Sequence, residues 1–221
     1  MKRCTVTFLA LGLALGLIVA ATSAAGAAAQ RPLGERAAVA RAHKASSPAG
    51  LTIRWDIVSY EFKTKPVPVS AGGQASARTG DRSKITLSGS GTFGGAPTNV
   101  AGGGTWTIFD PTGEVTGSGA YTVKALVGFF AAPGTFGSFA GLYELSDQIG
   151  SSDDAHAGLA VFRIAYSDGS QGTLTVSSRQ AGTPSTLFMG ITATKGFVAF
   201  WLPEPARGGV DGNRTLFHVV R

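Results

Sequence analysis

Apolar and polar residues alternate along most of the chain from Leu51 onward, a pattern typical of β-strands with one buried face. The stretch LTIRWDIVSYEFK, residues 51–63, shows it most clearly, because every second residue is apolar up to Ile57. The apolar positions then change phase at Val58 and continue at Tyr60. One inserted residue in a strand produces such a shift, so we predict a long first strand with a β-bulge at Ile57/Val58.

A short glycine-aromatic motif follows in three successive copies, GSGTF, GGGTW and GSGAY. Each copy places two glycines and one ring on the same face of a strand, and the rings are Phe93, Trp106 and Tyr121. Glycine weakens a strand interior, so its repetition indicates tight curvature or a large ring lying over bare backbone. We therefore predict a strongly curved antiparallel meander in which Gly104 and Gly119 leave no room for a side chain.

Further strand-like segments follow at similar spacing, and short links such as SDGSQG and TKG favour hairpins over helical crossovers. These segments are residues 158–169, 172–178, 186–194, 196–202 and 215–220. The Pro- and Gly-rich residues 64–80 are expected to form a loop. We predict an all-β fold, an antiparallel β-barrel of roughly eight to ten strands, because closure removes exposed sheet edges and accounts for the glycines. A β-sandwich is the alternative.

The N-terminus has the three parts of a secretory signal peptide. Lys2 and Arg3 precede an apolar run over residues 6–21, and small residues follow that run. We predict that residues 1–29 are removed by cleavage near Ala29, which gives a secreted protein without stable membrane insertion. An uncleaved anchor is the alternative, although the apolar run is shorter than the roughly 20 residues that a membrane-spanning helix needs. The Ala- and Gly-rich leader is typical of bacteria, and it contains the single cysteine.

The formal net charge of +6 is unevenly distributed. Residues 30–50 carry four basic side chains against one acidic, whereas residues 51–221, the predicted single domain, carry 13 against 12. A nearly neutral domain lacks the basic stripe that phosphate neutralisation requires, so we expect no nucleic-acid partner. The basic, Ala-rich segment 30–50 is predicted to be a disordered linker or a short helix. Weak electrostatic contact of that segment with an anionic cell surface is the alternative role.

Few residues of the predicted domain carry catalytic chemistry. The sequence contains neither a G-x-S-x-G nucleophile elbow nor a phosphate-binding loop, and the domain has no cysteine. Glu61, Arg163 and His156 are the candidates for acid-base catalysis. Arg163 is notable because it lies between two apolar residues of a predicted strand, so it must reach water, an acid or a polar cavity.

The loop SSDDAHAG places Asp153, Asp154 and His156 near one another. Carboxylates and an imidazole can bind a divalent metal or act as a base with its orienting acid. Their spacing matches no specific motif, and a site would need further ligands from elsewhere. We therefore expect a solvated acidic loop, and we predict no cofactor. His218, in the predicted last strand, is expected to be a surface or hydrogen-bonded core imidazole.

Aromatic residues offer platforms for flat apolar molecules and for sugars. Trp201 ends a predicted strand beside a long loop, and we expect it to be exposed at a barrel mouth. Trp106 and Tyr121 fall on apolar strand faces, where core packing competes with ligand binding. Together with Arg163, these three residues form the predicted ligand-binding set.

The glycine-aromatic repeat resembles, over about 40 residues, the curved strands of small secreted barrels such as the allene oxide cyclase and dirigent group. The resemblance is one of style and carries over no site residues. We predict non-catalytic binding of a small apolar or glycan ligand. A barrel isomerase or cyclase with a shape-dominated pocket is one alternative, and a cell-surface structural or adhesive protein is another. A cavity lined by Arg163 and a carboxylate would favour the enzyme, an apolar cavity the binder, and a filled core the structural protein.

Overall fold

The computed structural model describes residues 50–139 and 143–220. The predicted signal peptide and all of the basic segment except Gly50 lie outside the described residues. Within them the chain is all-β, with fifteen strands and one 3-10 turn. The elements are β1 (Thr52–Tyr60), β2 (Val67–Ala71), β3 (Ala75–Arg78), β4 (Lys84–Leu87), β5 (Ser90–Gly94), β6 (Ala96–Phe109), β7 (Val115–Ala132), β8 (Ser138–Phe139), β9 (Tyr143–Asp147), η1 (Ser152–Asp154), β10 (Ala155–Tyr166), β11 (Gln171–Ser178), β12 (Gly190–Lys195), β13 (Val198–Phe200), β14 (Leu202–Pro203) and β15 (Arg214–Val220).

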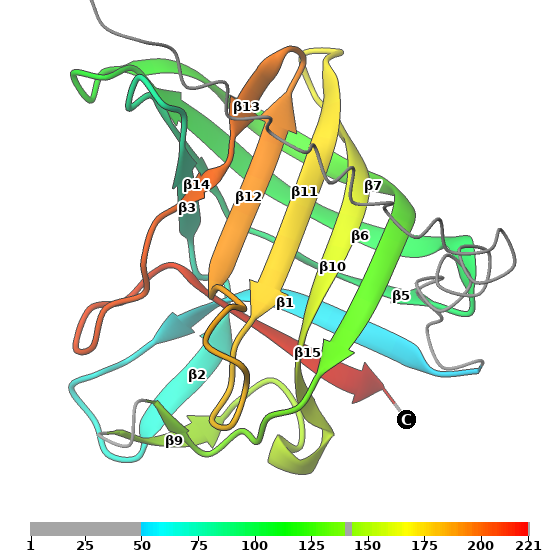
Figure 1. The fold of residues 1–221 in the computed structure, drawn as a ribbon, viewed down its shortest axis with the longest axis vertical. Coiled ribbons are helices and arrows are strands. Elements are labelled where there is room, and N and C mark those ends of the chain that lie inside the picture. Colours follow the sequence, from blue (N-terminus) through cyan, green and yellow to red (C-terminus); the bar gives the residue numbers. More distant parts are fainter. Residues whose placement is uncertain (1–49, 140–142, 221) are drawn as a thin grey trace, which may run out of the picture. The chain divides into compact units, whose positions relative to one another are not determined.

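Six of these strands close an antiparallel barrel (Figure 1), which confirms the predicted fold class. Around the ring, β10 pairs with β15, β15 with β1, and β1 with β5. The ring continues from β5 to β6 and β7, and β7 returns to β10. The sheet extends beyond the ring on two sides: β11, β12 and β13 follow from β10, and β4, β3 and β14 follow from β6.

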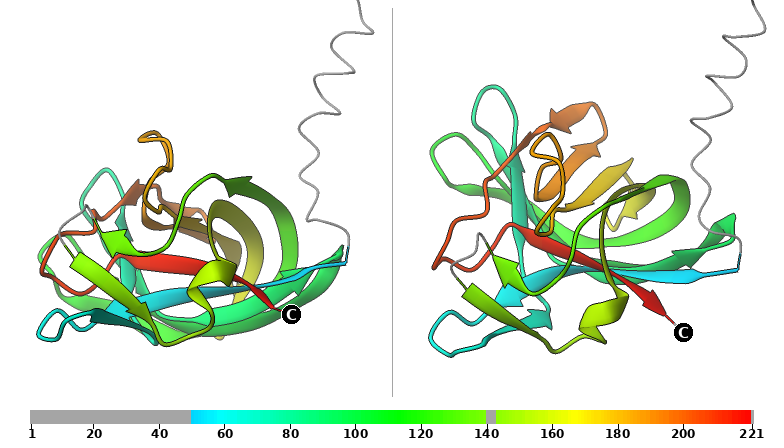
Figure 2. Two further views of the ribbon diagram at one scale, coloured as in Figure 1. Left: turned by 90° about the horizontal axis from the view of Figure 1, so that it is seen from below. Right: turned by 60° about the horizontal axis from the view of Figure 1, so that its bottom comes forward.

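β1 runs through the predicted bulge without interruption, so that prediction is wrong. Its pairing with β15, which lies beside it in both views of Figure 2, keeps one register from Thr52 to Val58. The apolar phase changes because both faces of the strand become covered, and residues 55–58 are all buried. Ile57 belongs to the cluster inside the barrel, whereas Val58 belongs to a second cluster on the other face of the strand.

The second cluster, which we call the outer cluster, is built by short strands that the sequence did not reveal. β2 pairs with the end of β1, and β9 pairs in parallel with β2. The buried members of the outer cluster are Val58, Tyr60, Val67, Val69, Leu145, Ala155 and Leu216. The segment 64–80 was expected to be a loop, but it contains β2 and β3. These strands are only five and four residues long, and although their burial alternates, the Pro and Gly residues in and around them favoured a loop.

Aromatic rings fill the interior of the barrel. The ring centroids of Trp55 and Phe162 lie 5.4 Å apart, and both side chains are fully buried. Phe93 packs on Phe129 with a centroid distance of 5.1 Å, and Phe217 lies 5.3 Å from Phe129. Contacts of this kind are favourable beyond the apolar area that they bury. The interior is therefore a packed core.

The glycine-aromatic repeat lies where neighbouring backbones and rings approach most closely. A Cβ on Gly104 would collide with the carbonyl oxygen of Ser88, and a Cβ on Gly91 would collide with the backbone of β6. A Cβ on Gly119 would lie 3.0 Å from Nε1 of Trp106, closer than ordinary packing allows. The prediction that these positions are kept bare is confirmed.

Candidate binding pocket

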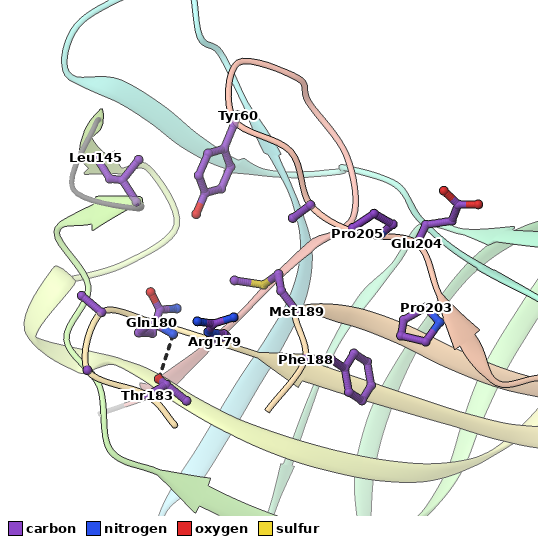
Figure 3. A pocket seen from close by; sticks show the side chains of 13 residues that line it. Tyr60, Leu145, Arg179, Gln180, Thr183, Phe188, Met189, Pro203, Glu204 and Pro205 are labelled. Atoms are coloured by element: carbon purple, nitrogen blue, oxygen red, sulfur yellow. Dashed lines mark hydrogen bonds between the residues drawn. The ribbon is translucent and has the colours of Figure 1, made fainter. Parts of the chain in front are cut away.

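The described residues form a pocket of about 620 Å³ beside the barrel core (Figure 3). Four segments build its walls: the end of β1, β9, the loop between β11 and β12, and the chain that follows β14. The lining consists of Tyr60, Leu145, residues 179–183, Phe188, Met189 and residues 203–206. Apart from Tyr60 at the end of β1, none of these positions belongs to the six strands of the closed ring.

The loop between β11 and β12 is anchored at both ends. The Gln180 N–H donates to Oγ1 of Thr183 over 3.0 Å, and that hydroxyl donates to the carbonyl oxygen of Pro133 over 2.9 Å. At the other end, Oγ of Ser177 donates to the carbonyl oxygen of Phe188 over 2.7 Å. Gln180 and Thr183 are both buried. The loop therefore presents its remaining side chains from a fixed backbone.

The facing wall is anchored to β3. Pro203 pairs with Ala77, and the Glu204 N–H donates to the carbonyl oxygen of Ser76 over 2.9 Å. The Glu204 carboxylate forms an ion pair with the guanidinium of Arg78. In Figure 3 the Glu204 side chain extends away from the loop on the opposite wall. The one carboxylate of the lining is thus engaged outside the pocket.

Tyr60 provides a neutral polar group. Its side chain is buried, and its hydroxyl points across the pocket toward the wall that carries Arg179 (Figure 3). The phenol is protonated at neutral pH, as an ordinary tyrosine is, and burial raises its pKa further, to about 12. The guanidinium of Arg214 lies 4.7 Å from the centroid of the ring and donates to the carbonyl oxygens of Val210 and Gly212 over 2.6 and 2.9 Å. This packing holds the ring in place.

Arg179 gives the lining its positive charge. The side chain is exposed, and no ion pair among the described residues involves it. Because Glu204 is paired with Arg78, nothing else in the lining offsets this charge. Beside the polar Tyr60, Gln180 and Thr183, the lining carries five larger apolar side chains: Leu145, Phe188, Met189, Pro203 and Pro205. The pocket therefore combines an apolar surface with one cation.

Two of the predicted ligand-binding rings lie in the packed core instead of the pocket. Trp106 is 5% exposed, and its Nε1 donates to the carbonyl oxygen of Ala120 over 3.1 Å. Tyr121 is 2% exposed, and its hydroxyl donates to the carbonyl oxygen of Ser88 over 2.9 Å. Both rings pack near Tyr166, at centroid distances of 5.7 and 6.4 Å. Both rings therefore pack in the core, which was the alternative considered for these strand faces.

Trp201 and Arg163, the other two predicted ligand contacts, are exposed but do not line the pocket. Trp201 is 68% exposed, as expected. Phe197, Val198 and Leu202, which are close to it in sequence, are exposed as well. Arg163 lies on the face of β10 opposite the buried Phe162 and Ile164, so it reaches water.

The acid-base and metal candidates also lie away from the pocket lining. Glu61 is exposed after the end of β1, and its carboxylate accepts a hydrogen bond from the Lys63 N–H over 3.1 Å. Asp153 and Asp154 form η1, and His156 is exposed on β10. In the part of the chain that the structure describes, no three His, Cys, Asp or Glu residues are grouped so as to hold a metal ion. The catalytic and metal roles considered for these residues stay predictions.

A buried hydrogen-bonded pair that sequence reasoning missed lies on the same side of the barrel as the outer cluster. Nε2 of His218 lies 2.6 Å from Oδ2 of Asp147, and the two side chains are 4% and 1% exposed. The other carboxylate oxygen of Asp147 accepts the Ile149 N–H over 2.9 Å. Nearby on β1, Arg54 donates two 2.8 Å hydrogen bonds to the fully buried Asp56. His218 is thus a hydrogen-bonded core imidazole, one of the two environments expected for it.

The pocket itself was not predicted. Its residues come from four separated segments, and only residues 179–189, RQAGTPSTLFM, carry a local signal. That connection is longer than the roughly two to five residues usual for a hairpin loop, and it contains a buried Gln and Thr. The predicted strand 186–194 concealed this length, because β12 begins only at Gly190 and residues 186–189 belong to the loop. The Gly- and Pro-containing residues 179–185 were the available signal, since loops often carry function.

Comparison with known proteins finds no matching family model, no matching curated protein and no matching solved structure. The stylistic resemblance to secreted barrels stays a prediction. Within the described ranges, no helix is long and apolar enough to cross a membrane.

Proposed function

We propose that the chain is an exported, non-catalytic binding protein that holds a small, largely apolar ligand in the pocket. The supporting observation is the pocket itself, whose volume of about 620 Å³ falls in the range of roughly 300–1,000 Å³ typical of small-molecule sites. Its anchored walls favour a preformed site. Its mainly apolar lining favours an apolar ligand over a glycan, because a glycan needs many polar partners.

Binding is favoured over catalysis by the ionisable groups that line the pocket. They are Tyr60, Arg179 and Glu204, and the lining contains neither His nor Asp. The phenol is protonated at neutral pH, and the carboxylate is paired with Arg78. General acid-base catalysis is most often carried by a His or by an unpaired carboxylate, and the lining supplies neither. The filled barrel core fits a structural protein, and the pocket is the observation that favours binding instead.

The proposal is tested with N-phenyl-naphthylamine, a neutral dye that fluoresces in apolar sites. Ala206→Trp would fill the pocket from its wall, and Ala131→Trp would place the same ring on an exposed position of β7. We expect the wild type and Ala131→Trp to bind the dye equally well, and Ala206→Trp to bind at least about tenfold more weakly, a loss of about 1.4 kcal/mol. Undiminished binding to Ala206→Trp, or no saturable binding by the wild type, would contradict the proposal.

A further inference from the structure

We infer that the ligand of this pocket is an amphiphile with a carboxylate head, which Arg179 binds, and an apolar body that packs against Leu145, Phe188 and Met189. The inference rests on the function proposed above and specifies the class of ligand. It follows from the charge of the lining, from the way Arg179 is presented, and from the volume available.

The charge of the lining calls for an anion. Arg179 and Glu204 are its only side chains that are ionised at neutral pH, and Glu204 is paired with Arg78. A neutral apolar ligand would partly desolvate the guanidinium of Arg179 without offering it an acceptor, which is unfavourable. A carboxylate would instead accept two parallel hydrogen bonds from the planar guanidinium, a strong and directional pairing.

Arg179 is presented from a fixed point of the backbone. Its predecessor, Ser178, ends β11 and pairs with Gly158 of β10. Its successor, Gln180, is anchored by its backbone N–H to Thr183. The side chain lies between Gln180 and Met189 on the wall opposite Tyr60 (Figure 3). A guanidinium held in this way orients an anionic head group as well as attracting it.

Tyr60 is compatible with an anionic head. Its hydroxyl points toward the same side of the pocket as Arg179, and like an ordinary tyrosine it is protonated at neutral pH, with burial raising its pKa further. A protonated phenol carries no negative charge and so does not repel a carboxylate. An ionised tyrosine at this position would have argued against an anionic ligand.

The volume and the apolar walls exclude a small inorganic anion as the best occupant. A pocket of about 620 Å³ is far larger than a phosphate or sulfate ion needs. Leu145 is only 9% exposed, and Phe188 and Met189 are partly buried around the same space. Apolar surface of this kind gains from contact with a hydrocarbon or ring system, whose removal from water is favourable.

The experiment compares decanoate with decanol, which have the same chain length and differ in the head group. Each is titrated at pH 7.5 against the full mature protein carrying N-phenyl-naphthylamine, and displacement of the dye is recorded. The variants are Arg179→Gln and, as a control, Lys124→Gln, which removes a cation from an exposed position of β7. Dye affinity without competitor reports whether each variant keeps its pocket.

We expect decanoate to displace the dye from the wild type and from Lys124→Gln at a concentration at least about tenfold lower than decanol. In Arg179→Gln this preference should vanish, while the affinity for decanol stays unchanged. Equal displacement by both compounds from the wild type, or a preference that survives in Arg179→Gln, would overturn the inference and leave the proposed binding function standing. If neither the dye nor either compound binds the wild type, the proposed function fails as well.

Discussion

Gly104 shows how one absent side chain allows the sheet to curve. Ser88 links β4 to β5, and both strands pair along one edge of β6. At this link the carbonyl oxygen of Ser88 occupies the space that a Cβ of Gly104 would need. The same link brings the Ser88 carbonyl within hydrogen-bond distance of the Tyr121 hydroxyl. A residue with any side chain at position 104 would have to move two strands apart.

We predict that Gly104→Val lowers the free energy of unfolding by more than about 1 kcal/mol, the usual scale of overpacking at a tight site. Gly119→Val should also destabilise, but by less, because the nearest obstacle there is the Ser167 side chain, which can rotate away. Gly80→Val is the control, since a Cβ at Gly80 meets nothing within 4 Å. Urea unfolding of the three variants and the wild type measures the differences.

At an ordinary strand position, a Gly→Val substitution would raise the free energy of unfolding, because valine has a higher strand propensity than glycine. If Gly104→Val were as stable as Gly80→Val, the close approach of the Ser88 carbonyl oxygen could not be what keeps position 104 bare.

At the scale of elements, alternation predicted strands well but could not show what covers them. Trp55, Phe93 and Trp106 face the barrel core because their neighbours on the same face are also apolar. The same pattern could not distinguish a bulge at Val58 from a second buried face, since both shift the apolar positions by one residue. The covering strands are short, and although β2 pairs with the preceding β1, β9 pairs with the distant β2, which no local pattern identifies.

The candidate site was less predictable than the fold for a related reason. Rings at regular spacing drew the ligand hypothesis to Trp106 and Tyr121, but regular spacing is a property of strands, and strand interiors build the core. Arg179 and Phe188 lie in an irregular loop, whose conformation depends on anchors such as Ser177 and Pro133. Those tertiary contacts leave no periodic trace in the sequence.

The pair of Asp147 and His218 joins the end of β9 to β15 and offers a test at this scale. We predict that Asp147→Ala lowers the free energy of unfolding by about 3 kcal/mol, because it leaves a buried imidazole and the Ile149 N–H without their acceptor. Asp153→Ala, at an exposed position of η1, is the control and should change stability little. Equilibrium urea unfolding at pH 7 measures both. A loss below about 1 kcal/mol for Asp147→Ala would mean that this end of β9 is held chiefly by the outer cluster.

At the scale of the whole molecule, the barrel core and the outer cluster both include residues of β1, and both contain buried tyrosines. Tyr121 and Tyr166 belong to the barrel core, and Tyr60 belongs to the outer cluster. Burial raises the pKa of all three phenols, that of Tyr60 to about 12. The folded chain therefore retains three protons that the unfolded chain loses above a pH of about 10. Unfolding is favoured as the pH rises through that region, because the unfolded state binds fewer protons.

We predict that the free energy of unfolding falls between about pH 10 and pH 12, by about 1.4 kcal/mol per pH unit for each tyrosine that ionises only in the unfolded chain. Tyr60→Phe removes one such group. The free energy of unfolding of this variant should therefore fall with pH less steeply than that of the wild type, with a slope smaller by about 1.4 kcal/mol per pH unit. Urea unfolding at several pH values from 9 to 11.5 gives both slopes. Other groups that titrate in this range are common to both proteins, and parallel slopes would mean that Tyr60 ionises as readily in the folded state as in the unfolded one.

The placement of the pocket outside the closed ring has an evolutionary consequence. The barrel interior tolerates only exchanges that conserve volume, since its rings pack against one another without spare room. Most of the pocket lining, apart from Tyr60 of β1 and Leu145 of β9, is carried by residues 179–189 and 203–206, which lie outside the six strands of the ring. Selection can therefore act on ligand preference and on folding almost independently. A lineage of such proteins could acquire new ligands by drift in two connections while inheriting one unchanged barrel.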